Sequence, residues 1–131
     1  MRLILDASAA IEVVLDRAKA PQFVRLLDDA DQVLAPELLV PEVVNTVWKY
    51  HQFENLSLNI CDRALEFAFN LVDVLVSCRD LYHEAFLLSR TARRPAYDMF
   101  YLALARREDA ALVTTDAALR KEAERQGIRV A

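Results

Sequence analysis

The chain has 131 residues, of which 55% are apolar and 27% are charged, and its formal net charge is −4 at pH 7. This length and composition predict one folded domain, spanning residues 1–131, that is large enough to bury a core. No uncharged run exceeds seven residues, which argues against a membrane-spanning helix, and the single glycine excludes a P-loop or a dinucleotide-binding fingerprint.

The N-terminal half of the chain predicts two strands and three helices. Residues 2–5 form a short apolar run, typical of a strand buried on both faces, and a helix follows at residues 7–15. A polar connection leads to a second helix at residues 22–28. Next come a short strand at residues 32–35 and a long helix that begins at residue 37 or 41 and ends at residue 53. The apolar stripe of this long helix is predicted on Val40, Val43, Val44 and Val47, with Trp48 adding bulk.

The C-terminal half continues the alternation. Helices are predicted at residues 58–70, 79–92 and 97–107, and the last of these is apolar enough to be mostly buried. A strand at residues 72–76 separates the first two. The remaining elements are a strand at residues 111–114, a helix at 117–126 that ends before Gly127, and a short strand at 128–130.

Strands alternate with helices along the whole chain. This order predicts an α/β fold in which a central, mostly parallel sheet is covered by helices on both faces. The carboxyl ends of parallel strands lie at one edge of a sheet, where ligands bind. Residues that follow the strands are therefore the first candidates for a site.

Four acidic residues stand where such a sheet would bring them to this edge. Asp6 follows the first strand and Asp116 follows the fourth, whereas Glu42 and Asp98 stand in the first turns of helices. Each has a local explanation, because Asp6 and Asp116 can cap helices and the other two favour the helix dipole. A shared site at this edge explains all four acids at once, without a separate local reason for each.

Carboxylates gathered in one place repel one another unless a proton or a cation intervenes. A set of oxygen ligands without nitrogen or sulfur selects a hard cation such as Mg²⁺ or Mn²⁺. Such an ion can activate a water and stabilise the leaving oxygen of a phosphodiester. The pattern therefore indicates metal-dependent phosphodiester hydrolysis. The same repulsion predicts that neutralising Asp98 stabilises the metal-free protein.

The four acids lie in stretches that resemble the acidic motifs of PIN-domain nucleases. These stretches are LDAS at 5–8, PEVVN at 41–45, YDMFYLALA at 97–105 and LVTTD at 112–116, in that family's order and spacing. The single-domain length and the PEVVN form resemble the VapC-type toxins of toxin–antitoxin pairs most closely. The resemblance implies an α/β/α sandwich with a central, mostly parallel sheet, and a Mg²⁺- or Mn²⁺-dependent endoribonuclease.

The resemblance also implies roles for individual residues and partners. It places the metal-binding and catalytic carboxylates at Asp6, Glu42, Asp98 and Asp116. It matches Ser8, Asn45 and Thr114 to polar positions that brace those carboxylates through hydrogen bonds. It further implies an RNA substrate, a small antitoxin protein whose tail enters the site, a homodimer and no membrane, and we expect a cytoplasmic location.

The net negative charge gives no basic-patch argument for nucleic acid binding. Residues 1–70 hold 6 Lys and Arg against 11 Asp and Glu, whereas residues 71–131 hold 10 against 9. Local groups of arginine are the substrate-binding candidates, although solvated helix faces also explain them. These candidates are Arg90, Arg93 and Arg94, followed by Arg106 and Arg107.

Other functions fit parts of the pattern. A haloacid-dehalogenase-type phosphatase also begins with a strand that ends in Asp, but it needs a second Asp two residues later, where this chain has Ser8. A receiver domain needs paired acids at its first strand and an acceptor Asp after its third, and neither is present. A PIN fold without nuclease activity, used for binding or assembly, is an alternative that the sequence leaves open.

Overall fold

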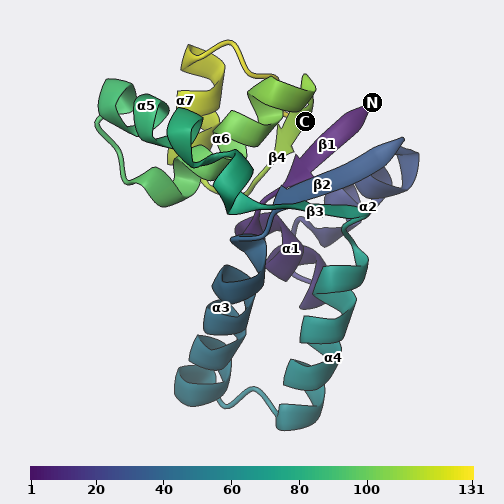
Figure 1. Cartoon of the computed structure of the whole chain (residues 1–131). Helices are drawn as coiled ribbons and strands as arrows, with labels where there is room; N and C mark the ends of the chain where they lie inside the picture. The colour runs from purple at the N-terminus through teal and green to yellow at the C-terminus, as the bar shows by residue number, and fades with distance from the viewer.

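The computed structural model describes residues 1–131 of the chain. Four strands and seven α-helices alternate along it, with one 3-10 turn at Cys78–Asp80 before the fifth helix. The strands are β1 Arg2–Leu5, β2 Gln32–Pro36, β3 Val74–Val76 and β4 Ala111–Val113 (Figure 1). The helices are α1 Ala7–Val14, α2 Ala20–Asp29, α3 Leu39–Glu54, α4 Leu58–Asn70, α5 Tyr82–Ala92, α6 Ala96–Glu108 and α7 Ala117–Arg125.

The four strands form one sheet in the order β3-β2-β1-β4, and every neighbouring pair is parallel. At the centre of the sheet, Leu3 of β1 lies opposite Val33 of β2 and Ala111 of β4. This arrangement confirms the predicted α/β fold and brings the carboxyl ends of β1 and β4 together. Asp6 continues from β1 and donates its backbone N–H to the carbonyl of Val113 at 3.2 Å.

Side chains of the sheet alternate between two cores. Leu3 and Leu5 of β1 pack into a core that includes buried side chains of α1, α2, α3 and α4. Ile4 packs into the other core, with buried side chains of α5, α6 and α7. Because helices cover both faces, the chain forms the predicted α/β/α sandwich. The apolar α6 supplies the buried centre of the second core, as its composition predicted.

The structure differs from the predicted elements at three places. β3 begins at Val74 because Asp73 accepts the N–H of Val33 through its own carboxylate at 2.7 Å, in place of a backbone carbonyl. The helix predicted at 79–92 begins only at Tyr82, after the 3-10 turn. The strand predicted at 128–130 is wrong, because only a single bridge joins Val130 to Leu112.

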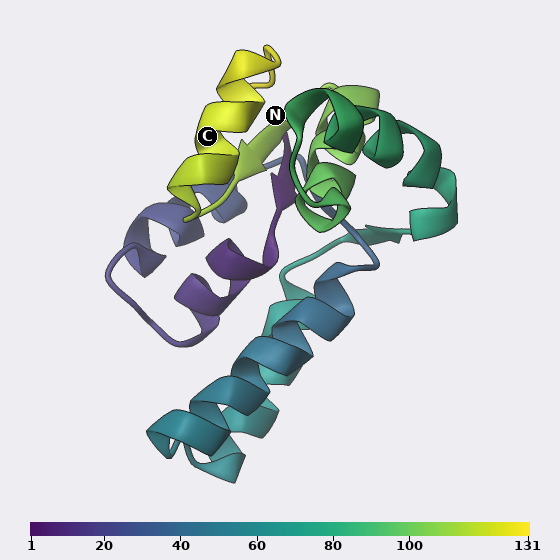
Figure 2. The same cartoon turned by 90° about the vertical axis from the view of Figure 1, so that its left-hand side faces the viewer.

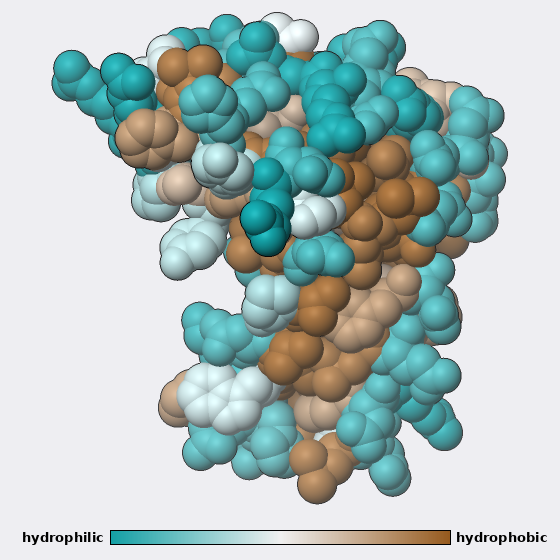
Figure 3. All heavy atoms as spheres, viewed as in Figure 1, coloured by the Kyte–Doolittle hydropathy of each residue, from teal (hydrophilic) through white to brown (hydrophobic).

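Helices α3 and α4 form a hairpin that projects beyond the sheet (Figure 1, Figure 2). The predicted apolar stripe of α3 is narrower than expected, because only the face of α3 that packs against α1 and α4 is buried. Val43 and Val47 are buried, whereas Val44 is 45% exposed and Trp48 is 51% exposed. Apolar atoms gather on the surface between the two helices and beside the sheet (Figure 3). None of the helices is both long enough and apolar enough to cross a membrane.

Candidate functional site

The four acids singled out in the sequence line one cleft of about 530 Å³. Asp6 and Asp116 reach it from the ends of β1 and β4, and Glu42 and Asp98 reach it from the first turns of α3 and α6. The topology therefore brings all four to the edge that the predicted sheet indicated. Ser8 and Asn45 also line the cleft.

Asp6 both caps a helix and belongs to the cleft. Its backbone is extended, and its carboxylate Oδ1 accepts the N–H of Ala9 at 2.9 Å, so it is the N-cap of α1. The same oxygen accepts the Ser8 hydroxyl at 2.7 Å, and Oδ2 accepts the Thr114 hydroxyl at 2.5 Å. With 5% of its surface exposed, Asp6 is the most buried of the four acids.

Burial raises the pKa of Asp6 from 3.8 to about 6. The three hydrogen bonds from Thr114, Ala9 and Ser8 lower this pKa, but the loss of hydration outweighs them, and the charge of Glu42 adds to the rise. The ionised form of Asp6 is therefore costly in the protein without a cation. A positive charge placed in the cleft would offset that cost.

Ser8 and Thr114 hold the ends of β1 and β4 together around Asp6. Each hydroxyl donates its only hydrogen to the carboxylate and accepts a backbone N–H from the segment that follows β4. Ser8 Oγ accepts from Thr115 at 3.0 Å, and Thr114 Oγ1 accepts from Asp116 at 3.0 Å. Both hydroxyls are thus satisfied, and the orientation of Asp6 is fixed by residues more than 100 positions apart in the chain.

Glu42 has a partner that the sequence analysis missed. The Tyr101 hydroxyl donates to Glu42 Oε1 at 2.6 Å, and Tyr101 itself is only 2% exposed. Burial raises the pKa of the Glu42 carboxyl, the Tyr101 hydrogen bond lowers it, and the charge of Asp98 adds to the rise. A tyrosine within a buried apolar helix needs a hydrogen-bond partner, which is the signal that could have identified it.

Asn45 lines the cleft but makes no side-chain hydrogen bond within the protein. It is exposed, and it lies one helical turn after Glu42 on the same face of α3. The structure therefore separates it from Ser8 and Thr114, which contact a carboxylate directly. Its amide is available to a ligand.

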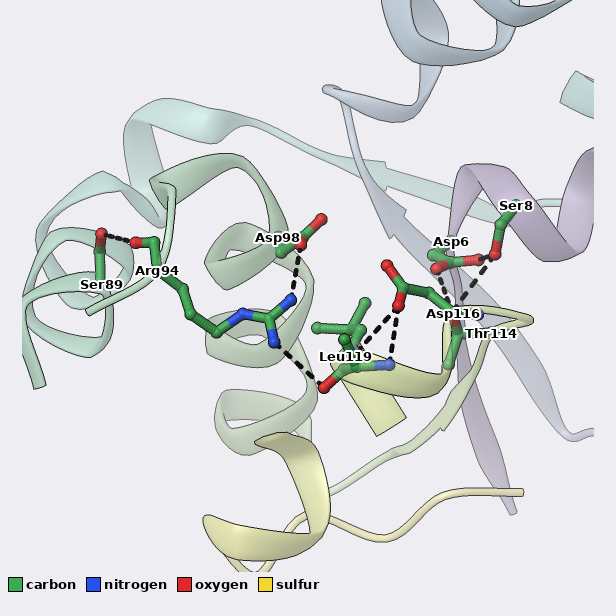
Figure 4. A network of polar contacts seen from close by, with 9 residues as sticks. Asp6, Ser8, Ser89, Arg94, Asp98, Thr114, Asp116 and Leu119 are labelled. Atoms are coloured by element: carbon green, nitrogen blue, oxygen red, sulfur yellow. Dashed lines mark hydrogen bonds and ion pairs between the residues drawn. The ribbon is translucent and has the colours of Figure 1, made fainter. Parts of the chain in front are cut away.

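Asp98 pairs with a cation from the loop that precedes α6 (Figure 4). Arg94 Nη2 lies 3.3 Å from Asp98 Oδ2, and Nη1 donates to the carbonyl of Ala118 in α7 at 3.2 Å. The Nε atom of Arg94 is buried without a partner. Asp98 therefore has its own counter-charge, which the expectation of simple repulsion at this residue did not include.

Asp116 caps α7. Its Oδ1 accepts the N–H groups of Ala118 at 2.9 Å and Leu119 at 3.1 Å, so the local explanation of this acid holds in the structure (Figure 4). The second oxygen, Oδ2, makes no hydrogen bond within the chain. A cap and a ligand are compatible roles for one carboxylate, because each role uses a different oxygen.

Most of the arginines predicted to bind substrate lie outside the cleft. Arg94 is at its rim through Asp98, whereas none of the other four arginines lines the cleft. Arg90 lies over the Phe86 ring, Arg93 ends α5, Arg106 pairs with Glu84, and Arg107 pairs with Glu108. The basic side chains that do line the cleft are Arg17 and Lys49, which the sequence analysis did not select.

The donor set fits a hard divalent cation, since it consists of carboxylate oxygens with no thiolate or imidazole. No group of three or more His, Cys, Asp or Glu side chains in the structure is arranged to hold a metal ion. Binding one would require side-chain rotation. Glu42, Asp98 and Asp116 are partly exposed and can turn toward Asp6, whose position is fixed.

Comparison with known proteins identifies the family of the chain. The family model of the PIN domain matches residues 3–124. The chain is 28% identical over 120 residues to ribonuclease VapC3 of Pyrobaculum aerophilum, covering 88% of this chain and 90% of that protein.

Two solved structures show a similar fold. PAE2754 from Pyrobaculum aerophilum superposes with a TM-score of 0.75 at 19% identity, covering 93% of this chain and 87% of that one. VapBC2 from Rickettsia felis, solved with a DNA fragment from its promoter, gives a TM-score of 0.68 at 16% identity, covering 99% and 96%.

Proposed function

Because the chain belongs to the PIN-domain family, we propose that it is an endoribonuclease that hydrolyses RNA phosphodiester bonds with Mg²⁺ or Mn²⁺. We further propose that it acts in the cytoplasm as the toxin of a toxin–antitoxin pair and forms one domain over residues 1–131. The similarity to ribonuclease VapC3 supports the reaction. The similarity of fold to VapBC2 supports the proposed role in a toxin–antitoxin pair.

One observation carries the proposal. A nearly inaccessible carboxyl, Asp6, lies in a polar cleft that three other acids share. Its pKa is raised to about 6, so the isolated protein holds this charge at a cost that a cation would remove. A binding or assembly module gains nothing from retaining this charge, and nothing in the structure favours that alternative.

The residues that would hold the ion are Asp6, Glu42, Asp98 and Asp116. A divalent ion, when bound, lowers the pKa of a water and offsets negative charge on the phosphate. The chain fixes Asp6 in advance and holds each of the other three acids by one oxygen, so a rotation of these three completes the site. Ser8 and Thr114 fix Asp6, while Tyr101 holds one oxygen of Glu42.

Asp98 and Asp116 are oriented in the same way. Arg94 holds one oxygen of Asp98, and the first turn of α7 holds one oxygen of Asp116. In each pair the remaining oxygen has no partner within the chain, so it is free to face a ligand. Outer-shell bonds of this kind orient ligands and tune their basicity.

The α3–α4 hairpin carries the surface that we propose for binding protein partners. Large apolar side chains are exposed along the α3–α4 hairpin (Figure 3), and contiguous apolar surface marks interaction sites. These side chains include Val44, Leu58, Ile60 and Phe67. We propose that an antitoxin protein and a second copy of the chain are its partners, and the mass of the purified protein in solution tests the homodimer.

The test is a cleavage assay on mixed single-stranded RNAs with EDTA, Mg²⁺ or Mn²⁺. We expect cleavage only with a divalent ion, and a loss of more than about 100-fold in Asp6→Asn and Asp98→Asn, since changes to outer partners alone cost about 10- to 100-fold. Asp62→Asn, an exposed acid on α4, is the matched control. Folded variants that cut as well as the unaltered protein would refute the site.

A further inference from the structure

The cleft has a second, basic end that the four acids do not explain. Arg17 and Lys49 line the same cleft as Asp6, together with the ring of Tyr50. Glu42, Asn45 and Lys49 follow one another at intervals of three and four residues, so they share one face of α3. At 1.5 Å per residue, Lys49 lies about 10 Å along the helix axis from Glu42.

The Arg17 guanidinium has contacts within the chain but keeps hydrogen-bond donors free. Its guanidinium lies over the Tyr50 ring, 5.3 Å from the centroid, which fixes the plane of the group. The only acid near it is Glu12, whose Oε2 is 3.9 Å from Arg17 Nε, and Arg17 makes no side-chain hydrogen bond within the chain. Most of its five donors therefore remain available to an incoming anion.

Lys49 is an exposed cation with no ion pair in the protein. Most of the arginines named earlier lack this freedom, because they pair with acids or lie over an aromatic ring. Two available cations on the wall of a cleft whose other end is acidic form a complementary surface for phosphate. The anionic ligand would extend from the acids along α3.

Aromatic surface continues beyond the basic end. An adjoining hollow of about 290 Å³ is lined by Thr46, Lys49, Tyr50, Phe53 and Glu54. Phe53 is 71% exposed and has the edge of Trp48 against it, with 5.9 Å between ring centroids. Exposed rings next to cations are the combination that binds unpaired bases and their backbone.

We propose that this basic end binds single-stranded RNA, with a phosphate next to the scissile one on Arg17 and Lys49 and an unpaired base against Phe53. The inference rests on the proposed function, because it treats the acids as the reaction centre. An unpaired strand is specified because a base face can stack on a side chain only when it is free of its own neighbours. The site thus selects loops and ends rather than duplex.

The test measures binding separately from cleavage. A fluorescein-labelled single-stranded RNA is titrated with protein by fluorescence anisotropy, in Mg²⁺ and on the Asp6→Asn background, so that the RNA stays intact. We expect Arg17→Ala/Lys49→Ala to weaken binding at least about 10-fold and to reduce the slope of log affinity against log salt by about 1.4, at about 0.7 per phosphate contact on a single strand. We expect Phe53→Ala to weaken it about 5-fold or more, since stacking on one base contributes about 1–3 kcal/mol.

The matched control is Arg63→Ala/Lys121→Ala, which removes the same two residue types from exposed positions on α4 and α7 outside the cleft. Its affinity should change less than about 2-fold, and Arg17→Lys/Lys49→Arg should recover most of the binding. Equal losses in the control and the cleft variant would overturn the proposal. So would duplex RNA binding as tightly as the single strand, or a polyglutamate peptide being the only ligand that responds to the cleft variant.

Failure of this inference can be distinguished from failure of the proposed function. If Asp6→Asn abolishes cleavage while Arg17→Ala/Lys49→Ala binds and cuts normally, the nuclease stands and the basic end is not its RNA site. If no divalent ion supports cleavage but RNA binding still depends on the two cations, the binding site stands and the nuclease assignment fails. Thermal melting of each variant confirms that the protein is folded in both cases.

Discussion

The raised pKa of Asp6 predicts that the metal-free protein loses stability as the pH rises. Between pH 3.8 and about 6 the folded protein keeps a proton on Asp6 that the unfolded chain has already released. Unfolding therefore releases a proton in this window, and raising the pH favours the unfolded state. The stability that the protonated carboxyl provides is complete below pH 3.8 and is lost as the pH rises through 6.

The size of the effect follows from the two pKa values. A change from 3.8 to about 6 corresponds to about 3 kcal/mol, at 1.36 kcal/mol per pKa unit, and Asp6 is buried enough for solvent screening to be small. Asp6→Asn removes the titrating group with nearly the same shape. We expect the free energy of unfolding of the unaltered protein, relative to Asp6→Asn, to fall by about 2.4 kcal/mol from pH 4 to pH 7, because the unfolded carboxyl is already more than half ionised at pH 4.

Urea unfolding of both proteins in EDTA at pH 4, 5, 6 and 7 measures this difference, and taking the difference cancels the titration of all other groups. Mn²⁺ added at pH 7 should stabilise the unaltered protein and leave Asp6→Asn almost unchanged, because only a ligand that binds the folded site shifts the equilibrium. A difference that is flat from pH 4 to pH 7 would refute the reasoning, as would one that grows in favour of the unaltered protein.

Two further predictions concern the partners of the other acids. Tyr101→Phe removes the hydroxyl that orients Glu42, and we expect the calorimetric affinity for Mn²⁺ to fall about 10-fold while the fold is kept; unchanged affinity would contradict the orienting role. Arg94→Met removes the ion pair with Asp98, and because both side chains are partly exposed we expect a loss of about 1 kcal/mol in urea unfolding at pH 7, smaller at high salt. A gain in the free energy of unfolding would show instead that the Arg94 guanidinium does not stabilise the folded protein through Asp98.

The sheet and the four acids could be predicted because their signals are local. The apolar run before Asp6 indicates a buried strand from its own residues, and the parallel order follows from the alternation of strands and helices. Once the strands are parallel, residues after β1 and β4 must lie at one edge. The position of Asp116 therefore followed from connectivity alone.

The remaining contacts depend on tertiary packing, which no spacing reveals. Arg17 lies in a connection with no pattern of its own and reaches the cleft only because α1 and α3 pack together. Val44 and Trp48 match an apolar stripe, but they lie outside the face of α3 that packs against α1 and α4, so they stay exposed. Repulsion at Asp98 follows from charge, and the charge of Asp98 does raise the pKa of Glu42, but no spacing indicated that the loop before α6 also places Arg94 beside Asp98.

The hydrogen bonds from Ser8 and Thr114 to Asp6 can all form only after both ends of the chain have been synthesised. Ser8 and Thr114 lie 106 positions apart in the sequence, and through Asp6 they connect the first strand to the last. A growing polypeptide emerges from the ribosome with its N-terminal segment first, so Asp6 is made early and its Thr114 partner late. Until β4 has been made and paired with β1, the Asp6 carboxyl lacks its hydrogen bond from Thr114. The cleft then also lacks the lining residues that follow β4. The order of synthesis thus delays assembly of the reaction centre until most of the chain has been translated.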